Sequence, residues 1–277
     1  MYAIDYLYNF SLCIYEVTIY CFYIYTYFSR DQVLNFEISE CRSLLLAKLT
    51  ALGYAVQEYL VSPFEAPIHI PNRRQRYYLI AQRLSSVDMV PPTPPLAHEL
   101  PPLPPNTAAY LRLPGHVAPL RAFLDADEPS ADLWVPEERL RSCPDFKFDI
   151  VTPDDFTSST FTKAYGSHYV IGTGSFLQTV AVPDLDKANP DHLIAARVRY
   201  FSPREIARLQ GFPVVETGVI DTDASRAVLT FPPLFATRDC FRLLGNSLNV
   251  KVVSYLLHVM CFHVGAATKP AECAASP

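Results

Sequence analysis

Proline is concentrated between Val90 and Pro105, and this segment limits the possible folds more than any other part of the chain. It reads VPPTPPLAHELPPLPP. Proline has no backbone N–H and fixes φ, so a run this dense forms neither a helix nor a central strand and favours an extended polyproline II conformation. We therefore predict a Pro-rich linker over residues 85–110, acting as a semi-rigid spacer or surface insertion. A ligand for a proline-reading domain is the alternative interpretation.

One helix and two strands are predicted before this linker. Ser39 is a suitable N-cap for a helix from about Glu40 to Leu52, and Gly53 is a suitable stop. Strand signals follow over Tyr54–Val61 and Tyr77–Gln82. Three leucines recur on one face of the predicted helix: Leu45, Leu49 and Leu52.

A helix boundary is also predicted near the C-terminus, where residues 241–253 read FRLLGNSLNVKVV. Gly245 permits a tight turn, and Asn246 and Ser247 are residues that cap helices. Apolar residues then recur at helical spacing: Leu248, Val252, Val253, Leu256, Leu257 and Met260. A helix beginning here would present backbone N–H groups that suit a carboxylate or phosphate. The alternative is a helix that only covers a core.

Composition and charge exclude several classes of protein. The 277 residues are half hydrophobic, which is enough for one large domain or two small ones. The net charge of −5 gives no overall basic field, so any nucleic-acid contact needs a local patch. Seven cysteines without a C-x-x-C pair indicate neither a disulfide scaffold nor a metal site. We expect a reduced compartment, cytoplasmic or nuclear.

The first 30 residues form an atypical Tyr-rich segment. Its uncharged run, Val17–Ser29, has 13 residues, whereas a membrane-spanning helix takes about 20. A signal peptide is not expected, because a basic region and a cleavage site are missing. A buried strand is the simplest interpretation. The alternatives are sequence that is not native to the protein and, ranked last, a membrane tether.

Several segments resemble motifs of the cytosine-C5 methyltransferases. Residues 242–250 (RLLGNSLNV) resemble the last motif of that family, residues 70–81 (IPNRRQRYYLIA) its Arg-x-Arg motif, and residues 199–213 (RYFSPREIARLQGFP) its penultimate motif. The penultimate motif also reads as a short helix by itself, because Ser202 and Glu205 fit a capping box and Gly211 a stop. Its implied role is structural.

The tRNA-methylating branch is indicated by residues 160–179, which read TFTKAYG followed by GTGSFLQT. The branch has cysteine before Phe-Thr, where this chain has Thr160. A looser similarity begins near Leu120 and becomes closer at residues 148–151. Residues 31–37 resemble a family segment in which a glutamate contacts the N3 edge of cytosine, and that position is Asp31 here.

The resemblance implies an α/β fold, with part of a Rossmann-like class I methyltransferase sheet and an inserted target-recognition domain. The implied parts are a catalytic-domain remnant (31–84), the target-recognition domain (111–198), a C-terminal return to the catalytic domain (199–263) and a disordered tail (264–277).

The resemblance also implies functional residues. Arg74 and Arg76 would contact the O2 of a flipped cytosine, with Asp31 as a third catalytic residue, and Asn246 and Ser247 would hold S-adenosylmethionine. The predicted RNA-binding residues are Phe161, Thr162, Lys163 and Tyr165. Lys163 offers a phosphate contact, and the two aromatic rings offer stacking faces.

The implied reaction is methylation of cytosine C5 in a tRNA anticodon loop, with tRNA, or else DNA, as the partner of a monomer that needs neither metal nor membrane. A thiolate must first add to C6 of the cytosine. The family's Pro-Cys nucleophile and Phe-x-Gly-x-Gly cofactor loop do not occur in this sequence. We therefore expect an N-terminally incomplete family member with little or no activity alone. The alternatives are an inactive RNA-binding pseudoenzyme and a DNA cytosine-C5 methyltransferase.

Overall fold

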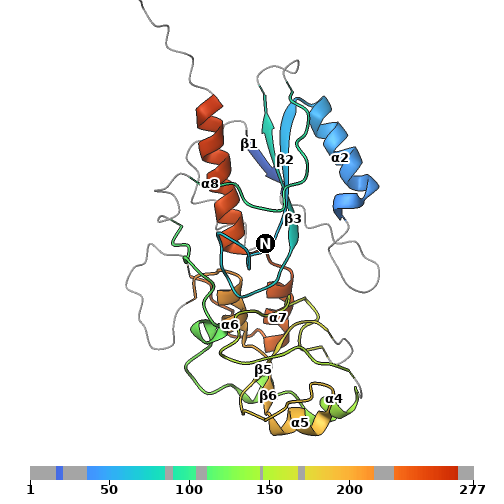
Figure 1. Ribbon diagram of the computed structural model, residues 1–277, viewed down its shortest axis with the longest axis vertical. Helices are drawn as coiled ribbons and strands as arrows, with labels where there is room; N and C mark the ends of the chain where they lie inside the picture. The colour runs from blue at the N-terminus through green and yellow to red at the C-terminus, as the bar shows by residue number, and fades with distance from the viewer. Residues whose placement is uncertain are drawn as a thin grey trace, which may run out of the picture. The chain divides into compact units, whose positions relative to one another are not determined.

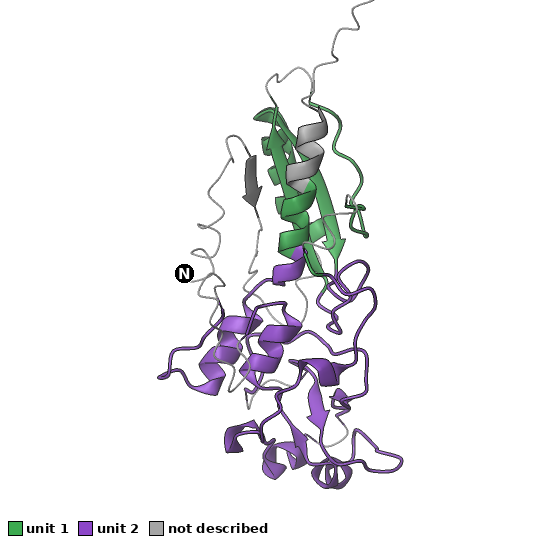
Figure 2. Cartoon of the chain, turned by 90° about the vertical axis from the view of Figure 1, so that its left-hand side faces the viewer, with its two compact units in different colours: residues 1–61, 75–112, 253–277 green, residues 62–74, 113–252 purple. Residues whose placement is uncertain are grey.

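The computed structural model describes residues 17–20, 36–84, 90–103, 111–143, 146–167, 172–214 and 228–267. The chain divides into two compact units, each assembled from separate stretches (Figure 2). Unit 1 contains Met1–Val61, Gln75–Arg112 and Val253–Pro277, and unit 2 contains Ser62–Arg74 and Leu113–Val252.

Unit 1 is built on an antiparallel sheet (Figure 1). Strands β2 (Tyr54–Val61) and β3 (Arg76–Arg83) pair along their whole length, with Tyr59 opposite Tyr78. Strand β1 (Val17–Tyr20) pairs with the other edge of β3. Helices α2 (Glu40–Ala51) and α8 (Val250–Ala267) lie on opposite sides of the sheet in both views. The two strands predicted around residues 54–82 are thus confirmed, whereas the aromatic positions predicted after residue 20 lie outside the described residues.

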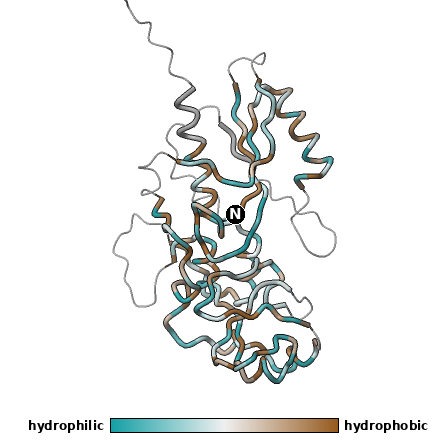
Figure 3. Tube along the Cα trace, viewed as in Figure 1, coloured by the Kyte–Doolittle hydropathy of each residue, from teal (hydrophilic) through white to brown (hydrophobic). Residues whose placement is uncertain are grey.

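Helix α2 (Glu40–Ala51) begins where its cap predicts. The backbone N–H of Arg42 donates to Oγ of Ser39 at 3.2 Å, and Gly53 follows the helix with a φ of 81°. Leu49 is buried against the sheet. Leu52 was expected on the same face, but it is the C-cap residue and half exposed. Figure 3 shows the alternation of hydrophobic and hydrophilic residues along this helix.

A buried carboxylate joins α2 to the hairpin. Glu58 is fully buried and accepts from Nε and Nη2 of Arg42 at 2.6 and 2.7 Å. The hydroxyl of Tyr77 donates to the same carboxylate. Burial, together with this hydrogen bond and the charge of Glu58, raises the pKa of Tyr77. The phenol of Tyr77 therefore stays protonated and acts as a donor. The Glu58 carboxylate thus connects α2 to both strands of the hairpin through hydrogen bonds.

The proline-rich segment has no helix between residues 90 and 103, as predicted. It does not run free of the fold, however. Ala97 donates to the carbonyl of Glu58 at 3.0 Å and accepts from the N–H of Leu60 at 2.8 Å, so it pairs with β2. The hydroxyl of Tyr255 also donates to the carbonyl of Pro101 at 2.6 Å. The segment thus covers one edge of the sheet within unit 1.

Unit 2 contains a small mixed sheet and several short helices. Strand β4 (Ile150–Val151) is parallel to β5 (Phe176–Gln178), and β5 is antiparallel to β6 (Val198–Arg199). The helical segments are η3 (Leu120–Phe123), η4 (Ala131–Leu133), α4 (Glu137–Arg141), α5 (Pro190–Ala195), α6 (Pro203–Leu209) and α7 (Thr237–Gly245).

Helix α6 has the predicted capping box. Oγ of Ser202 accepts from the N–H of Glu205 at 3.1 Å, and the Glu205 carboxylate accepts from the N–H of Ser202 at 2.7 Å. The same carboxylate is fully buried and takes two hydrogen bonds from Arg199, at 2.8 and 2.9 Å. This helix is therefore fixed to β6 through a buried ion pair.

Asp125 fixes the segment after η3 to the same helix. It accepts from the hydroxyl of Ser202 at 2.5 Å, from Arg208 at 2.8 Å and from Arg204 at 3.0 Å. Burial alone would raise the pKa of Asp125, but these hydrogen bonds and charges outweigh it and hold the pKa below its usual value. Residues 199–214 and 228–252 thus belong to the same compact unit as the region expected to recognise the target, and their predicted return to the catalytic domain stays a prediction.

Candidate RNA and cofactor site

The buried guanidinium of Arg74 lies at the centre of the predicted site. Arg74 is 1% exposed and donates to three backbone carbonyl oxygens. Nη1 donates to Phe161 at 2.9 Å, while Nη2 donates to Gly245 at 3.1 Å and to Ser247 at 2.6 Å. It therefore joins two segments that are far apart in sequence, which we call the FTK loop (Thr160–Ser167) and the 245–247 turn (Gly245–Ser247).

Asn72 and Arg73, the two residues before Arg74, are hydrogen-bonded to residues at and just before the start of the FTK loop. Asn72 is buried and donates to Oγ of Ser158 at 3.1 Å and to the carbonyl of Ser159 at 2.8 Å. Oγ1 of Thr160 donates to the carbonyl of Arg73 at 2.6 Å. Thr160, at the position where the tRNA branch has cysteine, thus supplies a hydrogen bond to this junction.

The predicted catalytic residues do not share one environment. The guanidinium of Arg74 points into the protein and contacts backbone carbonyls, and the base contact that the resemblance implies for it stays a prediction. Arg76 opens β3 in unit 1, is half-buried, and donates from Nη1 to the carbonyl of Gln75 at 2.6 Å. Asp31 lies outside the described residues.

The two aromatic residues of the FTK loop form part of the core. Phe161 and Tyr165 are 2% and 1% exposed, and their rings pack edge to face with centroids 5.0 Å apart. The hydroxyl of Tyr165 donates to the carbonyl of Ser175 at 2.6 Å and accepts from the N–H of Phe201 at 2.9 Å. Burial raises the pKa of Tyr165 well above its usual value. The stacking faces predicted for these rings are therefore not available to a base in this arrangement.

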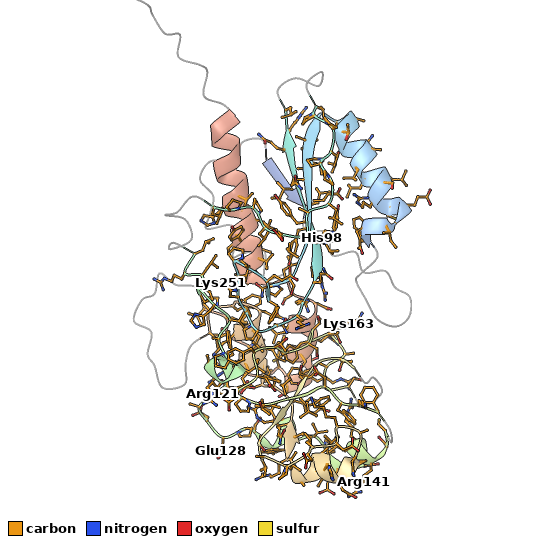
Figure 4. The ribbon with its side chains drawn as sticks, in the orientation of Figure 1. His98, Arg121, Glu128, Arg141, Lys163 and Lys251 are labelled. Atoms are coloured by element: carbon orange, nitrogen blue, oxygen red, sulfur yellow. The ribbon has the colours of Figure 1, made fainter. Side chains whose placement is uncertain are left out.

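The polar residues of the FTK loop lie nearer the surface. Lys163 is exposed beside α7 (Figure 4), and Thr162 is half-buried with its N–H donating to the carbonyl of Thr173 at 2.9 Å. The downstream Gly-Thr-Gly-Ser sequence is needed for close packing. A Cβ on Gly174 would lie 2.7 Å from the ring of Tyr165.

Glycine is also required where α7 meets the FTK loop. A Cβ on Gly245 would lie 2.1 Å from the backbone nitrogen of Lys163 and 2.2 Å from the carbonyl carbon of Thr162. Heavy atoms that are not bonded do not approach this closely, so only glycine allows the two backbones to touch. The loop with Lys163 and the turn with Asn246 are therefore in direct contact.

The 245–247 turn differs from the helix start that was predicted. Gly245 ends α7, Asn246 is its exposed C-cap residue, and α8 (Val250–Ala267) begins later. Asn249 caps α8, since its Oδ1 accepts from the N–H groups of Lys251 and Val252 at 3.1 and 3.2 Å. The helix cap was thus assigned to the wrong residues. The described buried apolar residues of α8 are Val252, Tyr255, Leu256 and Val259.

Gln210 is a residue of this site that the sequence did not reveal. It is 1% exposed, and its side chain accepts from the hydroxyl of Ser247 and donates to the carbonyl of Leu244 at 3.0 Å. Its own carbonyl accepts from the N–H of Val250 at 2.8 Å. The Ser247 hydroxyl is thus directed at Gln210. The nearest signal was the position of Gln210 directly before the helix-ending Gly211.

The described part of the chain offers neither a cluster of metal-binding side chains nor a membrane-spanning helix. No group of three or more His, Cys, Asp or Glu side chains is arranged there to hold a metal ion. None of the helices described has the length and apolar character needed to cross a bilayer.

Comparison with known proteins gives consistent matches, although no protein-family model matches the chain. A mouse (Mus musculus) protein, tRNA (cytosine(38)-C(5))-methyltransferase, is 32% identical over 302 residues, which cover 88% of this chain and 68% of the relative. A DNA (cytosine-5)-methyltransferase of Dictyostelium discoideum is 30% identical and covered over 65% of its length.

The fold matches as well. The crystal structure of the Schizosaccharomyces pombe Dnmt2 methyltransferase aligns with a TM-score of 0.62 and 28% identity, over 84% of this chain and 65% of that structure. The chain therefore spans about two thirds of these relatives, and it belongs to the cytosine-C5 methyltransferase family, with tRNA cytosine-38 methyltransferases among its relatives.

Proposed function

We propose that this chain contributes to S-adenosylmethionine-dependent methylation of C5 in a tRNA anticodon-loop cytosine, the position 38 named for its relatives. The observation that supports this most is the 32% identity to the mouse tRNA enzyme over 88% of the chain. The joined FTK loop and 245–247 turn are consistent with it, because they bring the segments expected to contact RNA and cofactor together.

In this proposal the FTK loop contacts the tRNA backbone. Lys163 is exposed, so its ammonium is accessible to a phosphate. Thr162 supplies a hydroxyl beside it. The buried rings of Phe161 and Tyr165 give this polar edge a rigid support instead of stacking on a base.

The 245–247 turn is the proposed cofactor contact. Asn246 is exposed, and a carboxamide is a side chain that suits the polar groups of S-adenosylmethionine. The Ser247 hydroxyl donates to Gln210 and Leu244, so toward a ligand it offers a lone pair only. When bound, S-adenosylmethionine supplies the methyl group. Arg76 and Asp31 keep their proposed contacts with the cytosine.

We also infer that the hairpin of β2 and β3 belongs to the Rossmann-like sheet implied by the family. The pairings described in unit 1 are antiparallel, so the parallel strands typical of such sheets are not among them. The likeness to the S. pombe methyltransferase supports this assignment. A tRNA substrate would place the activity in the cytoplasm or nucleus.

A second candidate function is RNA binding without turnover. Neither the Pro-Cys dipeptide nor the Phe-x-Gly-x-Gly sequence occurs in the 277 residues, and the chemistry needs a thiolate nucleophile. Little or no methyl transfer is therefore expected from this chain alone. DNA is the alternative substrate, because one relative is named for it.

The test is to incubate the purified chain with radiolabelled S-adenosylmethionine and either a tRNA transcript or duplex DNA, and to measure binding of each in parallel. We expect tighter binding of tRNA than of DNA at equal salt, with little methyl transfer. Robust methylation of tRNA would refute the expected inactivity. Robust methylation of DNA would refute the assignment of tRNA as the substrate. Absence of tRNA binding would refute the proposed function itself.

A further inference from the structure

We propose that Arg74 is a positioning residue that acts through Lys163: it fixes the FTK loop to the 245–247 turn and thereby sets the tRNA affinity of that loop. The inference rests on the proposed function, since it concerns the same contact with tRNA. It differs from the base contact that the family resemblance implies for Arg74.

The hydrogen bonds of Arg74 reach both sides of the junction. Its Nη1 donates to the FTK loop at Phe161, two residues before Lys163, and its Nη2 donates to the carbonyls of Gly245 and Ser247. A planar guanidinium presents several N–H groups in a fixed fork, so it can hold three carbonyl oxygens in a defined arrangement. A lysine ammonium retains the charge but cannot reproduce that geometry.

The contact at Gly245 makes the junction stiff. Gly245 packs directly on the backbone of Thr162 and Lys163, and a Cβ there would overlap both. Ser247 is held from the other side by Gln210. A shift of the loop relative to the turn therefore breaks close packing and the hydrogen bonds of Arg74 together. Arg74 therefore sets the position of Lys163, although Arg74 only holds the loop and Lys163 makes the proposed phosphate contact.

The experiment is a double-mutant cycle on tRNA affinity, measured by fluorescence anisotropy of a labelled transcript with wild type, Arg74→Lys, Lys163→Ala and the double variant. Loss of one charge-assisted phosphate contact is expected to weaken binding by about three- to tenfold in Lys163→Ala. Arg74→Lys, which keeps the net charge, is expected to weaken binding about threefold in the wild-type background and to have little effect in the Lys163→Ala background.

A charge-matched control is available next to the site. Arg73 is exposed and donates from Nε to Oγ1 of Thr157 at 3.0 Å, so Arg73→Lys is expected to leave affinity unchanged. Thermal melts of each variant separate folding from binding. Should Arg74→Lys fail to fold, Asn72→Ser removes the amide hydrogen bonds to Ser158 and Ser159 and so loosens the segment directly before the FTK loop. It is likewise expected to weaken binding in the wild-type background and to have little effect in the Lys163→Ala background.

The outcomes separate this inference from the proposed function. If Lys163→Ala leaves tRNA affinity unchanged, the RNA contact of the proposed function is wrong. If Lys163→Ala weakens binding while Arg74→Lys does not, or if their effects simply multiply, only the positioning role of Arg74 is overturned. A folded Asn72→Ser variant with wild-type affinity would also overturn it.

Discussion

Replacement of Gly245 by alanine is the sharpest stability test of the junction. Within an ordinary helix, the added methyl group would stabilise the protein, because glycine in a helix interior costs about 0.5–1 kcal/mol relative to alanine. Here the methyl carbon would lie 2.1 Å from the nitrogen of Lys163 and 2.2 Å from the carbonyl carbon of Thr162. Both are backbone atoms, so neither can rotate away.

The expected magnitude follows from these opposing effects. Overpacking costs about 1–3 kcal/mol in typical cores, and contact with rigid backbone places this site at the upper end. After subtraction of the helix-propensity gain, Gly245→Ala should destabilise the protein by about 2 kcal/mol. For a domain of this size that lowers the melting temperature by roughly 4–8 °C.

Thermal unfolding followed by circular dichroism measures this shift. Gly115→Ala is the matched control, because a Cβ on Gly115 would meet no atom within 4 Å. We expect the control to melt within about 1 °C of the wild type, since surface changes are small. If Gly245→Ala melts at or above the wild-type temperature, the close contact of α7 with the FTK loop is wrong.

Three further predictions concern polar groups elsewhere in the fold. Glu205→Gln should lower the free energy of unfolding by about 3–5 kcal/mol in urea titrations, because it leaves the buried guanidinium of Arg199 without its carboxylate; a loss below 1 kcal/mol would contradict that ion pair. The pKa of Asp125 is lower in the folded state, so its stabilising effect is present above the unfolded pKa and is lost as pH falls through the folded one. Asp125→Asn should therefore flatten the loss of stability as the pH falls below about 4, and an unchanged slope in acid titrations would exclude this role. Ser39→Ala should cost about 1 kcal/mol through loss of the α2 cap, whereas the exposed Ser43→Ala in the same helix should not, as urea titration of both variants will show.

Local signals in the sequence were sufficient for the elements with explicit boundaries. Ser39 and Gly53 bracket α2, and the capping box at Ser202 marks the start of α6. Strands β2 and β3 follow from their β-branched and aromatic composition. In each case the residues that determine the structure are neighbours in sequence, so no knowledge of the tertiary fold was needed.

Helix α7 and the cap of α8 were missed for a different reason. Gly245, Asn246 and Ser247 have the residue types of a helix start, but the same types also end a helix. Which one applies depends on the preceding turn, where Cys240, Phe241 and Leu244 already lie buried along α7. That spacing was a usable signal for a helix ending at Gly245.

The functional residues were only partly predictable. The family resemblance identified the segments that meet at the site, but it could not decide which way each side chain faces. Whether Arg74 points at a base or at backbone carbonyls depends on a contact 87 residues away in sequence, with Phe161. Whether Phe161 stacks on RNA or packs in the core depends on Phe201, which is also distant in sequence. Such contacts leave no local pattern.

The most direct test of the central claim is the salt dependence of tRNA affinity for wild type and Lys163→Ala. When the logarithm of the binding constant is plotted against the logarithm of the salt concentration, each phosphate neutralised by a lysine steepens the slope by about 0.9 for a duplex. For a single strand the change is about 0.7. We predict that Lys163→Ala binds more weakly and with a slope smaller by about 0.7 to 0.9. Identical slopes for the two proteins would contradict an RNA contact at the FTK loop, and with it the proposed role of this chain in tRNA methylation.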